Sequence, residues 1–128
     1  MIIFSKIING EIPCHKIWED ERFFAFLDIN PIQPGMTLVV PKVEIENPFD
    51  MDDNLYAAFL LAAKKLVPAI KAAAGSARVA LVIEGLDVPH AHIKLIPISH
   101  GSDLAQSNAK PASAEDLAAM AEKIRKEL

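Results

Sequence analysis

Residues 89–97 alternate polar and apolar side chains, and this pattern constrains the fold more than any other part of the chain. Alternation with period two predicts a strand over His90–Ile98, with His90, His92 and Lys94 on one face. The intervening Ala91, Ile93 and Leu95 then point into a core. Burying two histidines and a lysine without partners is costly. We therefore expect this polar row to face a bound ligand.

Further strands are indicated by short apolar runs bounded by turn residues. The first two runs are separated by a tight charged turn at Asp20-Glu21, which predicts a hairpin. The third is almost wholly apolar and could be covered on both faces. The predicted strands are 15–20, 23–29, 37–40 and 78–83.

Three helices are expected, of which the central one is the longest. Residues 2–8 have the apolar spacing of a short helix that ends at Asn9-Gly10. From Asn54 the apolar residues recur with helical spacing up to Gly75, a good helix terminator. Pro68 should kink this helix or split off its last turns. Ser113 begins a capping sequence, so a C-terminal helix is predicted over about 113–128.

Length and composition restrict the chain to one compact domain, 1–128, with a sizeable core. No apolar run approaches a membrane span, and the start lacks the pattern of a signal peptide. The single cysteine, Cys14, fits a reducing cytoplasm. The net charge of −4 argues against nucleic acid as the main partner. The order of strands, helix, strands and helix predicts a mainly antiparallel α+β fold.

Four segments, taken in order, resemble the histidine triad (HIT) family of nucleotide hydrolases and transferases. They are Ile3–Pro13 (IFSKIINGEIP), Phe24–Pro31 (FAFLDINP), Pro34–Lys42 (PGMTLVVPK) and the His90-x-His92 pair. The resemblance implies a five-stranded antiparallel sheet with one long helix, a short N-terminal helix and a C-terminal helix. It also implies a homodimer that binds a purine nucleotide or a nucleoside monophosphate derivative, with no metal or other cofactor.

The same resemblance assigns roles to individual residues. His92 would attack the α-phosphate and form a nucleotidyl-histidine, while His90 would orient the attacking ring through its backbone. An imidazole suits this role because it is largely neutral at pH 7 and offers a free lone pair. An aspartate suits ribose hydroxyls because both of its oxygens accept hydrogen bonds. The implied nucleotide-binding residues are Phe4, Ile7, Phe26 and Ile29 around the base and Asp28 at the ribose.

The chain departs from the family pattern around the phosphate. Lys94 replaces the third histidine of the triad, and Met36 and Ile83 replace a histidine and an asparagine. The phosphate loop is shortened, and Asp87 falls where a serine usually contacts phosphate. Our hypothesis is that Lys94 supplies the missing positive charge, either by neutralising Asp87 or by binding the phosphate itself.

Two other interpretations remain open at this stage. The lost phosphate contacts could leave a catalytically weak or silent nucleotide-binding or interaction module, because each preorganised donor contributes about 3 kcal/mol to a transition state. His90 and His92 could instead share a metal ion. That second interpretation is less favoured, because only Asp87 is nearby as a third ligand and Lys94 adds repulsion.

Overall fold

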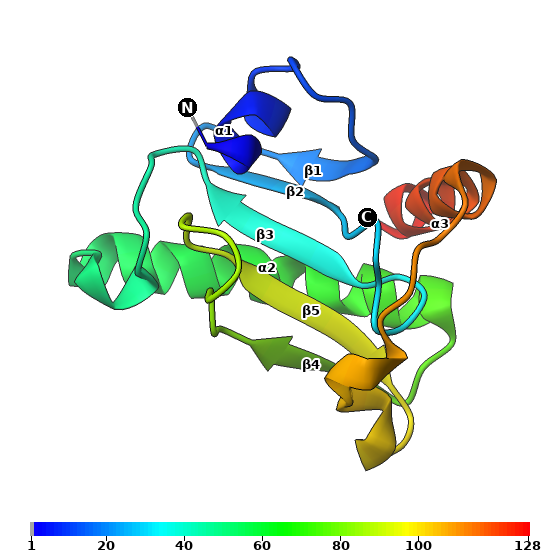
Figure 1. Cartoon of the computed structure of the whole chain (residues 1–128). Helices are drawn as coiled ribbons and strands as arrows, with labels where there is room; N and C mark the ends of the chain where they lie inside the picture. The colour runs from blue at the N-terminus through cyan, green and yellow to red at the C-terminus, as the bar shows by residue number, and fades with distance from the viewer. Residues whose placement is uncertain (1) are drawn as a thin grey trace.

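The computed structural model describes residues 2–128 and contains one five-stranded sheet in which all neighbouring strands are antiparallel (Figure 1). The strand order is β1-β2-β3-β5-β4. The long connection from β3 to β4 contains the central helix. The expected α+β class and the strand count are confirmed. The strands are β1 (Lys16–Glu19), β2 (Phe23–Leu27), β3 (Thr37–Pro41), β4 (Arg78–Val82) and β5 (Ile93–Ile98).

The three predicted helices are all present, and local capping explains where they begin and end. In α2, the Asp52 side chain accepts a hydrogen bond from the Leu55 amide, and Gly75 ends the helix in the left-handed conformation at φ 67°. In α3, the Ser113 hydroxyl accepts from the Asp116 amide. The helices are α1 (Ile3–Ile8), α2 (Asp53–Ala74) and α3 (Ala114–Glu127), with short 3-10 helices η1 (Pro48–Asp50), η2 (Gly101–Leu104) and η3 (Gln106–Asn108).

The sequence predicted that Pro68 either kinks the central helix or splits off its last turns, and the split is wrong. The helix α2 runs without interruption through this proline to Ala74. Pro68 is exposed, so its ring lies on the solvent side of the helix. A helix that packs on a sheet curves with its solvent side convex, which accommodates a missing backbone hydrogen bond on that side.

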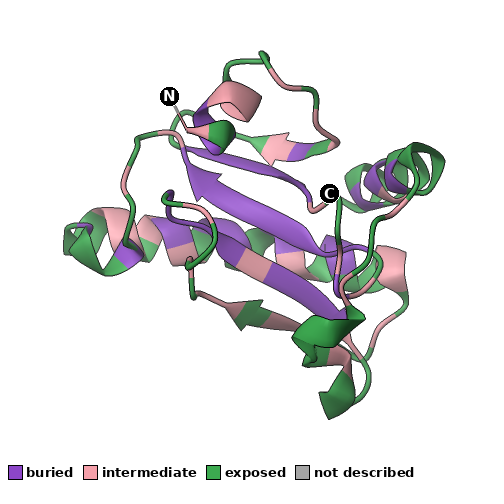
Figure 2. Cartoon of the chain, in the orientation of Figure 1, coloured by how far each residue is buried: buried purple, intermediate pink, exposed green. Residues whose placement is uncertain are grey.

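One face of the sheet is covered by α2 and α3, and we call it the helix-covered face (Figures 1 and 2). It carries every second residue of the central strands, packed against the apolar sides of both helices. Phe23 of β2 stacks on Phe59 of α2 with ring centroids 5.6 Å apart. The strand residues of this face are Ile17, Phe23, Ala25, Leu27, Val39, Ile93 and Leu95.

The opposite face, which we call the histidine face, is covered by α1 and by loops. The alternate residues of β2 and β3 pack here against Phe4 of α1 and against Met36. Strand β3 is therefore buried on both sides, as its apolar run predicted. The buried members of the histidine-face cluster are Phe4, Phe24, Phe26, Ile32, Met36, Leu38, Val40 and Ile96.

Strand β5 begins at Ile93, three residues later than expected, so His90 and His92 precede it. The backbone amide of Ala91 donates to the Ile45 carbonyl instead of to β3, and the ladder ends at the Val39–Ile93 pair. Pro41 at the end of β3 has no amide hydrogen to extend the ladder. Ala91, Ile93 and Leu95 are nevertheless fully buried, as the alternation predicted.

No helix within residues 2–128 is long and apolar enough to cross a membrane.

Candidate active site

His92 is held in a defined orientation on the histidine face. Its side chain is 4% exposed, and its Nδ1 lies 2.7 Å from the backbone oxygen of His90. A carbonyl oxygen can only accept, so Nδ1 donates and carries the ring proton, which leaves Nε2 with a free lone pair in the neutral ring. Within residues 2–128, Nδ1 of His90 is the only fully buried side-chain nitrogen or oxygen without a partner, so Nε2 of His92 is not fully enclosed.

His90 is fully buried directly before His92, where its side chain fixes the local backbone. Its Nε2 donates to the Pro41 carbonyl at 2.8 Å, which ties the histidine segment to the end of β3. Burial lowers the pKa of His90 and keeps the ring neutral, while the bond to Pro41 acts in the opposite direction. Its Nδ1 is buried without a hydrogen-bond partner. The side chain of His90 therefore supports the site, and its carbonyl oxygen orients His92.

Lys94 turns its ammonium toward Glu84, which follows β4. The two side chains form an ion pair with 2.7 Å between Nζ and Oε1, and the Lys94 side chain is only 12% exposed. The hydrogen bond from Lys94 is the main cause of a lowered pKa of Glu84, against partial burial, and His92 adds a small electrostatic contribution in the same direction. Lys94 is paired with Glu84, and not with Asp87 as one branch of the sequence hypothesis suggested.

An apolar wall surrounds the two histidines. The Phe4 ring of α1 forms T-shaped pairs with His92 at 5.2 Å and with His90 at 5.7 Å between centroids, and it also contacts Phe26 at 5.6 Å. Ile7, one helical turn after Phe4, is half-buried against the same cluster. The structure therefore brings Phe4, Ile7 and Phe26 into one cluster, which contacts His92 through Phe4.

The remaining sequence-predicted residues lie toward solvent. Asp28 follows β2 and is half-buried, and its Oδ1 accepts from the Asn30 amide at 2.8 Å, which leaves Oδ2 available. Ile29 is 60% exposed and does not join the buried cluster. Asp87 is exposed in the loop between β4 and β5. These three residues therefore lie at the solvent-exposed rim of the site and not in its buried part.

The substituted positions have structural roles of their own. Met36 is 2% exposed, and its sulfur accepts a weak hydrogen bond from the Ile32 amide. It therefore packs within the histidine-face cluster and offers no ring nitrogen toward His92. Ile83 is half-buried and packs against the helix-covered core. The hydrogen-bonding groups that the family pattern has at these two positions are absent.

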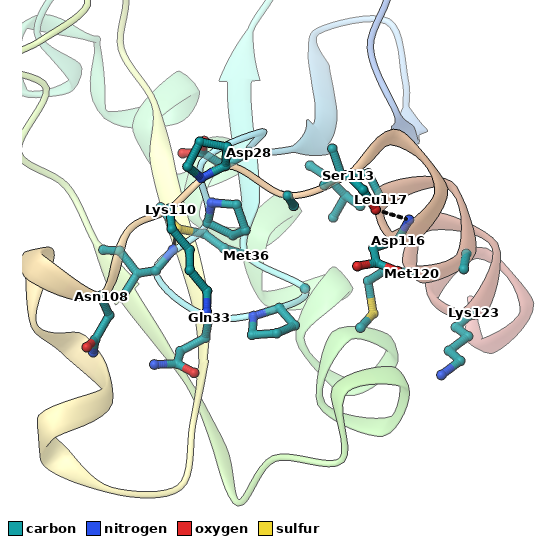
Figure 3. A pocket seen from close by; sticks show the side chains of 18 residues that line it. Asp28, Gln33, Met36, Asn108, Lys110, Ser113, Asp116, Leu117, Met120 and Lys123 are labelled. Carbon is teal, nitrogen blue, oxygen red and sulfur yellow. Dashed lines mark hydrogen bonds between the residues drawn. The ribbon is translucent and has the colours of Figure 1, made fainter.

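A cavity of about 580 Å³ lies at the end of the sheet, between the β2–β3 loop, the 108–113 segment and the start of α3 (Figure 3). Of the predicted site residues, only Asp28 lines it. Lys110 and Lys123 extend from separate walls, and Asp116 offsets part of their charge. The amide of Ala112 donates to the Ile29 carbonyl and holds the 108–113 segment beside Asp28. Because the lining contains two aspartates and two lysines, it favours neither an anionic nor a cationic ligand.

Glu84 is the site residue that the sequence reasoning missed. The sequence does contain a signal for it, because Glu84 directly follows the predicted strand 78–83 and Lys94 lies in the next predicted strand, 90–98. Val82 lies opposite Lys94 in the register of β4 and β5, so a residue two places beyond Val82 is a diagonal neighbour of Lys94. Opposite charges at such positions predict an ion pair, once the register is known.

Comparisons with known proteins agree with this architecture. The family model of the HIT domain matches residues 9–101. An uncharacterized HIT-like protein of Methanocaldococcus jannaschii is 42% identical over 109 residues, which cover 79% of this chain and 81% of that protein.

Two further relatives extend the comparison to a solved structure and to a named activity. A HIT-like protein of Bartonella henselae, crystallised with an unknown ligand, has a TM-score of 0.89 at 32% identity, covering 99% of this chain and 96% of that one. The adenylylsulfatase HINT3 of Arabidopsis thaliana is 33% identical over 100 residues, or 74% of this chain and 51% of that protein. The domain match and the sequence identity together show that this chain belongs to the HIT family.

Proposed function

We propose that this protein binds a purine nucleotide and hydrolyses a nucleoside phosphoramidate or a related nucleotide ester through a nucleotidyl-histidine on His92. The orientation of the His92 ring carries the proposal. Because Nδ1 donates to the His90 carbonyl, the lone pair of Nε2 is directed away from that carbonyl and is free to attack. The Arabidopsis relative, named an adenylylsulfatase, supports a nucleotide substrate.

The proposed reaction has two displacement steps at phosphorus. In the first, the Nε2 lone pair forms a P–N bond while the bond to the leaving group breaks, and the leaving group departs with that electron pair and takes up a proton. In the second, water attacks phosphorus, loses a proton to solvent, and the P–N bond breaks to return the electron pair to Nε2. The His90 carbonyl stabilises the ring while it carries positive charge.

Binding roles follow from the surroundings of His92. Phe4, Ile7 and Phe26 offer an apolar wall for a planar base, with Ile29 at its exposed rim. The free oxygen of Asp28 accepts from a ribose hydroxyl. Lys94 stabilises charge on the phosphoryl oxygens, and Asp87 lies at the outer edge of the phosphate site.

We further propose that the protein is a cytoplasmic homodimer and does not bind nucleic acid. Strand β4 is an edge of the sheet, and its Leu81 is 45% exposed, as expected for a surface that a second copy covers. Light scattering coupled to size-exclusion chromatography measures this directly. A mass of one chain at micromolar concentration would refute the dimer.

The His92→Ala variant tests the catalytic proposal. We expect turnover of an adenosine phosphoramidate to fall by about 10⁴-fold or more, because the nucleophile is removed. His100→Ala is the matched control, since its side chain is 79% exposed and lies outside the site. Turnover should be unchanged in that control.

The same assay distinguishes the alternative of a silent binding module. That alternative is favoured by Met36, which supplies no hydrogen bond where the family pattern has a histidine. A wild-type protein that binds adenosine monophosphate without turning over the phosphoramidate would establish the module. Equal turnover by wild type and His92→Ala would contradict the nucleotidyl-histidine.

A further inference from the structure

We infer that Glu84 sets the charge specificity of the phosphate site, which favours a phosphorus group with one negative charge over one with two. The inference rests on the proposed function, because it concerns the group that His92 attacks. It is carried by the ion pair between Glu84 and Lys94. The positive charge of Lys94, already shared with Glu84, is then insufficient to balance a second negative charge on the phosphoryl group.

The contacts of Glu84 hold it in place beside the histidines. Its Oε1 accepts from the Lys94 ammonium at 2.7 Å, and its Oε2 lies 3.4 Å from the Leu86 amide. Leu86 belongs to the short loop that precedes His90. Glu84 therefore connects this loop to β5, and the Lys94 side chain, only 12% exposed, is fixed by the same contact.

The ion pair of Lys94 and Glu84 contributes no net charge to the phosphate site. Lys94 contributes one positive charge and Glu84 one negative charge, while His90 is kept neutral by burial. Asp87 adds a second carboxylate at the exposed edge of the loop. A phosphate ester or amide of a nucleoside carries one negative charge, whereas the free monophosphate carries nearly two above its second pKa of about 6. The ion pair therefore disfavours the monophosphate product and promotes its release.

Two ligands that differ only in charge test this inference. Adenosine 5′-monophosphate is a dianion at pH 8, and adenosine 5′-methylphosphonate is a monoanion of nearly the same shape that has no leaving group. Isothermal titration calorimetry at pH 8 and low ionic strength gives both dissociation constants for each variant. We expect the wild-type protein to bind the methylphosphonate more tightly.

Glu84→Gln removes one negative charge and keeps the shape of the side chain. Coulomb energies scale with the product of the charges, so the logarithm of the affinity gain for the dianion should be about twice that for the monoanion. We expect about a tenfold gain for adenosine 5′-monophosphate and about a threefold gain for the methylphosphonate. Product inhibition of turnover should increase in parallel.

Two control variants separate charge from geometry. Glu84→Asp keeps the charge and should keep the wild-type preference. Glu122→Gln makes the same change in the exposed ion pairs of α3, away from the histidine face, and should leave both affinities unchanged. Thermal unfolding confirms that each variant is folded.

The possible outcomes are distinguishable. An unchanged ratio of the two dissociation constants in Glu84→Gln would overturn the role of Glu84 and leave the nucleotide site intact. Failure of the wild-type protein to bind either ligand would overturn the nucleotide site itself, and this inference with it.

Discussion

The two faces of the sheet are both well buried, but they are built from different chemistry. The helix-covered face packs apolar strand residues against α2 and α3, and none of its buried residues within 2–128 is a histidine. The histidine face has a smaller apolar cluster, and His90 and His92 are buried beside Phe4. Each buried histidine there has one ring nitrogen bound to a backbone carbonyl.

This contrast indicates how the chain separates stability from function. A buried apolar side chain contributes about 1.5–3 kcal/mol and needs only close packing, so the helix-covered face stabilises the fold mainly through packing. A buried polar group needs hydrogen-bond partners, which fix its orientation, and a buried nitrogen left without one, such as Nδ1 of His90, costs stability. The histidine face therefore sacrifices some stability for a defined arrangement of rings.

The largest effect is expected from a truncation on the helix-covered face. Phe59→Ala should lower the free energy of unfolding by about 3–5 kcal/mol, because the ring is fully buried and stacked on Phe23. Phe49→Ala is the matched control, since that ring is 69% exposed. Urea denaturation measures both variants. Nucleotide affinity per folded molecule should be unchanged in Phe59→Ala, and a large loss of affinity would break the separation of the two faces.

A truncation on the histidine face should cost less stability. His90→Ala should lower the free energy of unfolding by about 2–4 kcal/mol, because it leaves a cavity and removes the donor to the Pro41 carbonyl. The backbone oxygen that orients His92 remains, so turnover per folded molecule should fall far less than in His92→Ala. If both variants lost turnover equally, the His90 side chain would have a direct part in the chemistry.

The smallest expected effect is on the pH dependence of stability. Burial lowers the pKa of His90 below its ordinary value of 6.5, so the unfolded chain binds a proton more readily than the folded one. The free energy of unfolding should therefore be insensitive to this group above about pH 7 and fall as the pH drops from 6.5 toward 5. The slope from one such group is at most about 1.4 kcal/mol per pH unit.

Urea denaturation at several pH values, compared between wild type and His90→Ala, isolates this contribution. The carboxyl groups with lowered pKa, among them Glu84 and Asp103, lose stabilisation only below their ordinary values near 4. They fall outside the window from pH 6.5 to 5. Identical slopes for the two proteins in that window would show that His90 is not the group responsible.

Local sequence was sufficient for the parts of the fold that depend on neighbouring residues. Alternation around His92 predicted which residues face each side, because side-chain direction in a strand follows from backbone geometry alone. Gly75 and Ser113 predicted helix ends for a similar reason, since caps are formed within a few residues. For Pro68 the sequence left a kink and a split open, and only the tertiary structure excluded the split, because tolerance of a proline depends on which side of α2 faces solvent.

The chain's own residues thus determined the α+β class, the order of its elements and the pairing of two histidines on one face. The tertiary structure alone decided that β5 begins after the histidines and that Lys94 pairs with Glu84 and not with Asp87. The physical reason is the reach of the contacts. The first set depends on patterns within one segment. The strand register, the hydrogen bond of His90 to the Pro41 carbonyl and the ion pair of Lys94 with Glu84 each depend on contacts between different segments of the chain.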